Sequence, residues 1–115
     1  TRKRKVEIFC EGESMSVPVQ AISYAESQGH EQCLYMIGWS KEKLYTRLTM
    51  AQLEELLFPQ GFLRIHKQYL VNMTYLQSLQ STGAVLTTGK SLKASARNYR
   101  ENQKKFVNWK AQQLW

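Results

Sequence analysis

The segment Gly61–Asn72 (GFLRIHKQYLVN) contains the residues of this chain whose types and spacing best suit chemistry. Apolar and aromatic side chains on both sides enclose the polar group His66-Lys67-Gln68. Such anchors restrict how a short connection moves, so Lys67 and Gln68 are held outward, where they can reach phosphates or base edges. An ordinary connection between strands with solvated polar residues has the same pattern, and the pattern alone does not separate the two interpretations.

Catalytic constellations are nearly absent. The chain contains no aspartate, and its two histidines, His30 and His66, fall in different expected elements. Neither a Ser/His/Asp triad nor an aspartate pair can therefore be built. The CxxC and HxxxH spacings of zinc sites and the glycine-rich phosphate loop are also missing. We expect no enzymatic activity, no metal and no cofactor.

Cys10 and Cys33 are the only cysteines. Two cysteines in a chain of 115 residues do not make a disulfide framework, so a reducing cytoplasm is the simpler interpretation. We expect both to be buried as small apolar residues. A redox pair is the less favoured alternative.

The net charge of +7 is concentrated at the two ends of the chain. Residues 1–5 carry four positive charges and residues 90–115 carry seven against one glutamate, whereas residues 6–89 carry five positive and eight negative charges. Such clustering favours a polyanionic partner, with nucleic acid first and an anionic membrane surface second. Basic ends kept for solubility would look similar. No apolar run approaches the roughly 18 residues of a membrane span.

Period-two patterning predicts the elements that position these residues. The chain alternates apolar and polar residues in ten short segments and changes to helical spacing once, where Thr49 and Gln52 fit a capping box. The expected strands are Val6–Cys10, Met15–Val19, Ile22–Glu26, Gln32–Gly38, Leu44–Leu48, Phe62–Ile65, Tyr69–Asn72, Tyr75–Gln80, Ala84–Thr88 and Leu92–Ala94, with a helix at Thr49–Leu57. An all-β, sandwich-like domain follows.

Three parts are expected along the chain. Residues 1–5 are the basic end of a linker, residues 6–95 form the β domain, and residues 96–115 form a polar, lysine-rich helical tail. The first residue is Thr and not Met, which favours a fragment whose partner domain lies upstream.

The segment Gly61–Asn72 resembles the hallmark of the LytTR family of bacterial DNA-binding domains. That hallmark is a strand–turn–strand of the form F-x-R-x-H-x-x-Y-x-V-N. The matching positions are Phe62, Arg64, His66, Tyr69, Val71 and Asn72. The resemblance extends to an early strand ending in glutamate (19–26), to the helix (48–57) and to the closing strand and turn (90–97). It covers nearly the whole chain.

This resemblance implies about ten strands in three small antiparallel sheets. It implies DNA binding through loops that enter two successive major grooves, as two copies side by side on imperfect direct repeats. Most members are output domains of two-component response regulators, joined to an N-terminal receiver. Because a receiver takes phosphate on aspartate and this chain has none, phosphorylation would occur in an upstream segment.

The family's DNA-reading loops correspond to three connections of this chain. The first is Gln28–Gln32, with His30 and Gln32 as candidates, although Glu31 there would repel phosphate. The second is His66–Gln68, with Lys67 as the main contact beside Gln68. The third is Ala94–Arg100, where the Arg97 fork suits guanine O6 and N7. Asn98 and Arg100 are expected near phosphates.

Supporting roles are expected for the other motif residues. His66 is expected to pack and orient the connection, Arg64 to pair with a carboxylate such as Glu26, and Asn72 to satisfy backbone groups of a turn. Trp109 and Trp115 are expected to anchor the tail helix. Lys104, Lys105 and Lys110 are expected on its solvated face.

The sequence is therefore interpreted as a sequence-specific double-stranded DNA-binding output domain of a cytoplasmic bacterial regulator, without membrane contact. The alternatives are a protein-interaction module with a basic docking surface and a non-specific nucleic-acid binder. An RNA-binding β domain is less favoured, because the aromatic strand platform that it needs is not apparent.

Overall fold

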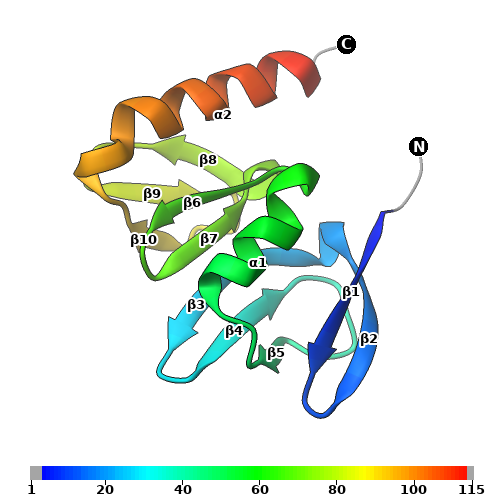
Figure 1. Ribbon diagram of the computed structural model, residues 1–115. Helices are drawn as coiled ribbons and strands as arrows, with labels where there is room; N and C mark the ends of the chain where they lie inside the picture. Colours follow the sequence, from blue (N-terminus) through cyan, green and yellow to red (C-terminus); the bar gives the residue numbers. More distant parts are fainter. Residues whose placement is uncertain (1–3, 114–115) are drawn as a thin grey trace.

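The computed structural model describes residues 4–113, so most of the expected linker (residues 1–3) and Trp115 lie outside the described residues. Within that range the chain forms ten strands and two α-helices (Figure 1). In chain order they are β1 (Lys5–Cys10), β2 (Glu13–Pro18), β3 (Ile22–Gln28), β4 (Glu31–Met36), β5 (Lys43–Thr46), α1 (Met50–Leu57), β6 (Phe62–His66), β7 (Tyr69–Asn72), β8 (Leu76–Leu79), β9 (Gly83–Leu86), β10 (Ser91–Lys93) and α2 (Tyr99–Gln113). The expected mainly-β fold is confirmed.

The strands of the described chain form two antiparallel sheets, and the expectation of three was wrong. The larger sheet has the order β2-β1-β5-β4-β3-β7-β6 and the smaller one the order β10-β9-β8. Two strand pairings join the seven strands into one sheet. The first is β3 with β7, since β3 also pairs with β4 on its other side. The second is β1 with β5, at the single pair Cys10↔Thr46.

The two faces of the seven-stranded sheet belong to different cores. Because side chains alternate along a strand, Leu70 and its neighbour Val71 point to opposite faces. Leu70 packs in a cluster with Leu53 and Leu57 of α1, whereas Val71 packs with residues of the small sheet and with Phe106 of α2. Helix α1 thus covers one face, and the small sheet and α2 cover part of the other (Figure 1).

Helix α1 begins with the expected capping box. The Thr49 hydroxyl accepts from the Gln52 backbone amide at 3.1 Å, and the Gln52 side chain accepts from the Thr49 amide at 2.8 Å. After α1 the chain turns at Gly61, whose φ of 96° lies in the left-handed region that glycine adopts without strain.

Trp109 anchors α2 on the body of the domain, as expected. It is half-buried against the second core, and its indole nitrogen would lie 2.9 Å from a Cβ atom added at Gly61. Any larger residue at position 61 would therefore displace the Trp109 ring and would be strained by the positive φ. The lysines of α2, Lys104, Lys105 and Lys110, are exposed, as expected.

Both cysteines are free and fully buried, which does not fit a redox pair. Burial raises the pKa of the Cys10 thiol to about 11 and also raises the pKa of Cys33. Across residues 4–113, no three His, Cys, Asp or Glu side chains gather closely enough to hold a metal ion. Neither α1 nor α2, the helices of this range, has the length and apolar character of a membrane span.

Candidate nucleic-acid interface

Three connections lie next to one another along one edge of the domain, on the left in Figure 1. They are the β3–β4 turn (28–31), the β6–β7 turn (67–68) and the segment that follows β10 and includes the start of α2 (94–100). Backbone hydrogen bonds join them: the Ser27 amide donates to the Gln68 carbonyl at 2.9 Å, and the Ser95 amide donates to the Ile65 carbonyl at 2.7 Å. These three connections are termed the loop edge, and they are the connections that the sequence resemblance selects.

Two side chains of β6 fix the β6–β7 turn. The Nδ1 atom of His66 accepts from the Gln68 amide at 3.1 Å, and the Arg64 guanidinium donates to the Lys67 carbonyl at 2.8 Å. The expected orienting role of His66 is thus seen in the geometry. Lys67 and Gln68 themselves are exposed. Their side chains therefore face solvent, while hydrogen bonds from Arg64 and His66 hold the backbone of the turn.

Arg64 pairs with Glu54 of α1 at 3.4 Å, and the expected pairing with Glu26 was wrong. The reason lies in the alternation of β6. Phe62 and Arg64 point to the face that α1 covers, whereas Glu26 points to the opposite face, where it accepts from the Tyr69 hydroxyl. A carboxylate partner was correctly expected, but it comes from the helix.

The pKa of His66 is held below its ordinary value of 6.5, mainly by burial and then by the positive charges of Lys67 and Lys93. The imidazole is therefore neutral near pH 7, which leaves Nδ1 free to accept the Gln68 amide.

Arg97 and Asn98 lie in a single 3-10 turn, Ala96–Asn98, directly before α2. Both are exposed, as is Arg100 in the first turn of α2. Together with Lys67, His66 and other residues, Arg97 and Asn98 line an open groove of about 620 Å³. The structure thus brings the second and third connections to one groove. Glu54 and Glu101 also line it, so its charge is mixed and not uniformly basic.

The β3–β4 turn exposes His30 but not Gln32. Gln32 is only 6% exposed, and within residues 4–113 its side-chain oxygen has no hydrogen-bond partner. It follows the inward alternation of Leu34 and Met36 along β4, a period-two signal that was already present in the sequence. The structure therefore does not bring Gln32 to the loop edge.

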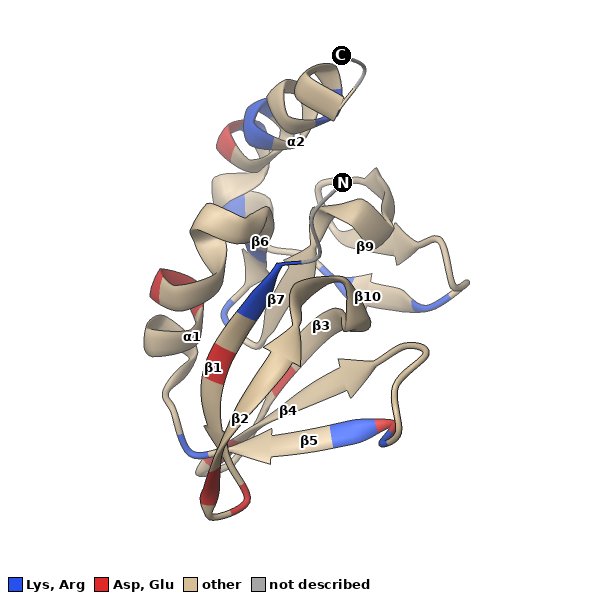
Figure 2. Cartoon of the chain, turned by 90° about the vertical axis from the view of Figure 1, so that its right-hand side faces the viewer, with Lys and Arg blue, Asp and Glu red and all other residues tan. Residues whose placement is uncertain are grey.

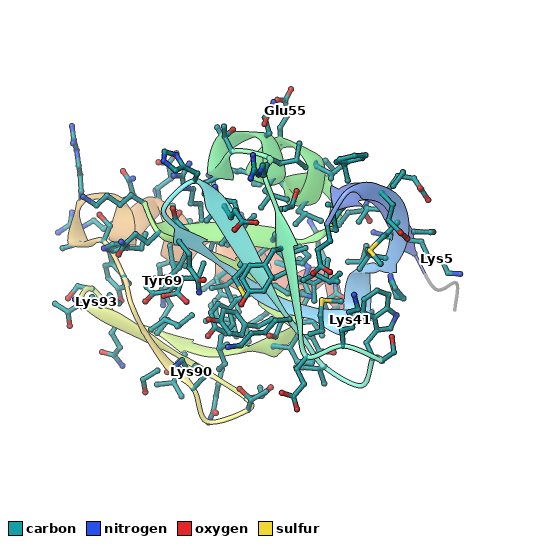
Figure 3. The ribbon with its side chains drawn as sticks, turned by 90° about the horizontal axis from the view of Figure 1, so that it is seen from below. Lys5, Lys41, Glu55, Tyr69, Lys90 and Lys93 are labelled. Atoms are coloured by element: carbon teal, nitrogen blue, oxygen red, sulfur yellow. The ribbon has the colours of Figure 1, made fainter. Side chains whose placement is uncertain are left out.

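Two exposed residues of this edge were missed in the sequence. Lys93 ends β10 close enough to His66 to lower its pKa, and Gln28 is both the last residue of β3 and the first of the β3–β4 turn. Figure 3 shows Lys93 and Tyr69 on the side of the molecule opposite Lys5. Lys93 stands within the basic closing segment, which was the available signal, whereas nothing local marks Gln28.

Asn72 fixes the far end of the β6–β7 hairpin, as expected from the motif. It is completely buried, and its amide nitrogen donates to the carbonyls of Ile22 at 2.9 Å and Val19 at 3.3 Å. Its side-chain oxygen accepts from the Thr74 amide at 3.0 Å. One side chain thus joins β7, the start of β3 and the following turn.

The β1–β2 hairpin, on the side of the domain away from the loop edge, carries acidic residues. Figure 2 looks at the side away from the loop edge and shows acidic residues gathered on the β1–β2 hairpin. Glu11 there pairs with Lys41 at 3.0 Å, and this hydrogen bond is the main cause that lowers the pKa of Glu11. The same side also carries basic residues on β1 and β5 (Figure 2), so the hairpin is a local acidic patch on a side of mixed charge.

Comparison with known proteins gives a family match and a structural match. The profile of the LytTr DNA-binding domain family matches residues 12–106. The fold is similar to a solved structure described as the LytTr DNA-binding domain of a methyl-accepting/DNA response regulator from Bacillus cereus. The two share 17% identity with a TM-score of 0.69, over 93% of this chain and 98% of that chain. No curated protein matches the chain by sequence.

Proposed function

The chain belongs to the LytTR family of DNA-binding domains, and from this premise we propose that it reads specific sequences of double-stranded DNA through its loop edge. The observation that carries this proposal is that exposed Lys67 and Arg97 line the same groove. Each stands on a short segment whose backbone is hydrogen-bonded to β6. Preorganised contacts of this kind lose little entropy on binding.

The exposed candidate residues on and beside the loop edge have roles that suit their chemistry. Arg97 reads a guanine through its bidentate fork, a contact worth about 1–3 kcal/mol of discrimination. Lys67 and Gln68 reach a phosphate or a base edge, and His30 approaches from the neighbouring turn. Four further residues contact phosphates or lie near them: Lys93, Asn98, Arg100 and, more weakly, Lys104. Gln32 is left out of this set because its side chain is buried.

The wider setting is part of the same proposal. Two copies bind adjacent direct repeats, an upstream receiver or other regulatory domain controls the DNA-binding domain, and the whole protein acts as a bacterial transcriptional regulator in the cytoplasm without catalysing a reaction. Family membership and the basic loop edge support this setting.

Titration of labelled duplexes tests the proposal. Sites selected from random DNA, with one or two repeats, are compared with scrambled duplexes over a salt series. We expect tighter binding to the selected sites and a slope of log affinity against log salt of about −5, as for roughly six neutralised phosphates. Equal and weak affinity for every duplex would instead indicate a non-specific polyanion binder.

Lys41→Ala is the matched control for the loop-edge lysines. Lys41 is exposed and lies on the side away from Lys93 (Figure 3). Its removal should leave the salt slope unchanged, whereas Lys67→Ala should reduce the slope by about one unit.

A further inference from the structure

Glu26 lies at the centre of a group of polar and aromatic side chains near the β3–β4 turn. Its carboxylate accepts from the Tyr35 hydroxyl of β4 at 2.8 Å and from the Tyr69 hydroxyl of β7 at 3.4 Å. It thereby connects the strands on both sides of β3. Tyr35 is fixed further by stacking on Tyr24, with ring centroids 4.4 Å apart.

The side-chain amide of Gln28 rests on this group. Its nitrogen lies 3.3 Å from Oε1 of Glu26 and 3.2 Å from the Tyr35 hydroxyl oxygen. Gln28 is exposed and is the last residue of β3, two positions before His30. Its neighbour Ser27 is hydrogen-bonded to the β6–β7 turn.

While Gln28 lies on these two partners, their chemistry favours one orientation of its amide. A carboxylate has no proton to donate, and the single proton of the Tyr35 hydroxyl is directed to Glu26. Both partners therefore only accept, and the group that faces them must be the nitrogen of Gln28. Burial first, and then the hydrogen bond to Glu26, raises the pKa of Tyr35, so the hydroxyl keeps its proton.

The carbonyl oxygen of Gln28 is consequently the atom turned away from this group, and no described residue donates to it. A freely rotating glutamine presents either its donor or its acceptor to a base. Gln28 instead presents an acceptor, because rotation of the amide would place two oxygens against each other at Glu26.

We propose that Gln28 is a specificity-determining residue that accepts a hydrogen bond from an exocyclic amino group in the major groove. On the contacted strand it favours adenine, through N6, or cytosine, through N4. Guanine and thymine present O6 and O4, which are acceptors and face the glutamine oxygen unfavourably. This inference rests on the proposed sequence-specific binding of DNA and adds to it one position that reads amino against keto bases.

Selection of binding sites from random duplexes tests the inference, with four proteins compared. They are the unchanged chain, Gln28→Ala, Tyr35→Phe and the control Gln20→Ala, which removes an exposed glutamine before β3, at the end of that strand away from Gln28. We expect the unchanged chain to favour A or C over G or T at one position by about fivefold, the value of one neutral hydrogen bond. Gln28→Ala should lose that preference alone, and Gln20→Ala should keep it.

Tyr35→Phe tests the orientation of the Gln28 amide, because this variant keeps the glutamine but removes one group that orients it. The variant keeps the ring that stacks on Tyr24 but removes one of the two acceptors that hold the Gln28 nitrogen. We expect similar affinity for the best site and a reduced amino-against-keto preference at the same position. Thermal unfolding of each variant verifies that the domain remains folded.

The outcomes distinguish this inference from the proposed function. A binding motif that is identical for the unchanged chain and for Gln28→Ala would overturn the role of Gln28 while leaving sequence-specific binding intact. If the unchanged chain yields no motif, the proposed function fails, and the inference fails with it.

Discussion

The β6–β7 turn and the β3–β4 turn lie side by side on the loop edge, yet they are fixed in different ways. The β6–β7 turn is held by its own strand, because Arg64 and His66 reach forward to the backbone of Lys67 and Gln68. The β3–β4 turn has a glycine with φ of 64° at its tip, and the side chain at its base rests on Tyr35 and Glu26. Support from the same strand produces a fixed spacing in the sequence, whereas support that depends on Tyr35 of the neighbouring strand does not.

The largest expected effect comes from removing the support of the whole β6–β7 hairpin. Asn72→Ala should lower the free energy of unfolding by about 3 kcal/mol, since it removes the three hydrogen bonds of a completely buried side chain, to the carbonyls of Val19 and Ile22 and from the amide of Thr74. Urea denaturation measures the change. Asn108→Ala, at an exposed position of α2, is the control and should change stability by less than about 0.5 kcal/mol. Equal losses would mean that Asn72 does not support the hairpin.

The next largest effect is a loss of sequence preference on DNA, and it should be larger for the segment 94–100 than for the β3–β4 turn. Arg97→Ala should reduce the preference for a selected site over random DNA by about tenfold to a hundredfold, the loss of one bidentate base contact. His30→Ala should reduce it less, and Lys104→Ala should weaken both kinds of binding slightly. Fluorescence anisotropy gives these affinities. If Arg97→Ala weakened specific and random binding equally, Arg97 would be a phosphate contact only.

A smaller effect is expected when the clamp on the β6–β7 turn is loosened. Arg64→Lys keeps the positive charge but loses the fork that joins the Lys67 carbonyl to Glu54. We expect specific affinity to fall about fivefold, the value of one hydrogen bond that holds the turn, with little change in stability. An unchanged affinity would show that the turn is rigid without Arg64 and would remove the contrast between the two turns.

The smallest effect is a dependence of stability on pH that comes from His66. Its pKa is lowered in the folded state, so the unfolded chain takes up this proton first. The contribution of His66 is complete above the ordinary pKa of 6.5 and is lost as the pH falls through 6.5 toward the lower folded pKa. Urea denaturation between pH 7 and pH 5 should show a steeper loss for the unchanged chain than for His66→Gln. Parallel curves would contradict this assignment.

Local signals made much of the fold predictable from sequence. Alternation placed the strands within a few residues, and the Thr49 capping box placed α1, because each depends on residues close together in the chain. The number of sheets was not predictable, since it depends on β3 pairing with both β4 and β7.

The candidate site divides in the same way. Lys67 and Arg97 could be predicted as candidates because they stand at fixed distances from recognisable motif residues. The partner of Arg64 was misjudged because the correct carboxylate, Glu54, lies on α1. That helix covers the face of the sheet to which Arg64 points, whereas Glu26 points to the other face. Gln28 was missed because its significance depends on Tyr35, which the β3–β4 hairpin brings to it.

Strand β6 ends the seven-stranded sheet, and an edge strand ordinarily offers its unpaired backbone groups to strands of other molecules, which leads to aggregation. Here the carbonyl oxygens of Arg64 and Ile65 already accept hydrogen bonds from the Asn102 side chain and the Ser95 amide. The segment that carries Arg97 into position therefore also closes this edge. The hydrogen bonds that position the proposed DNA-reading surface therefore also hinder β6 from pairing with an edge strand of another copy of the domain.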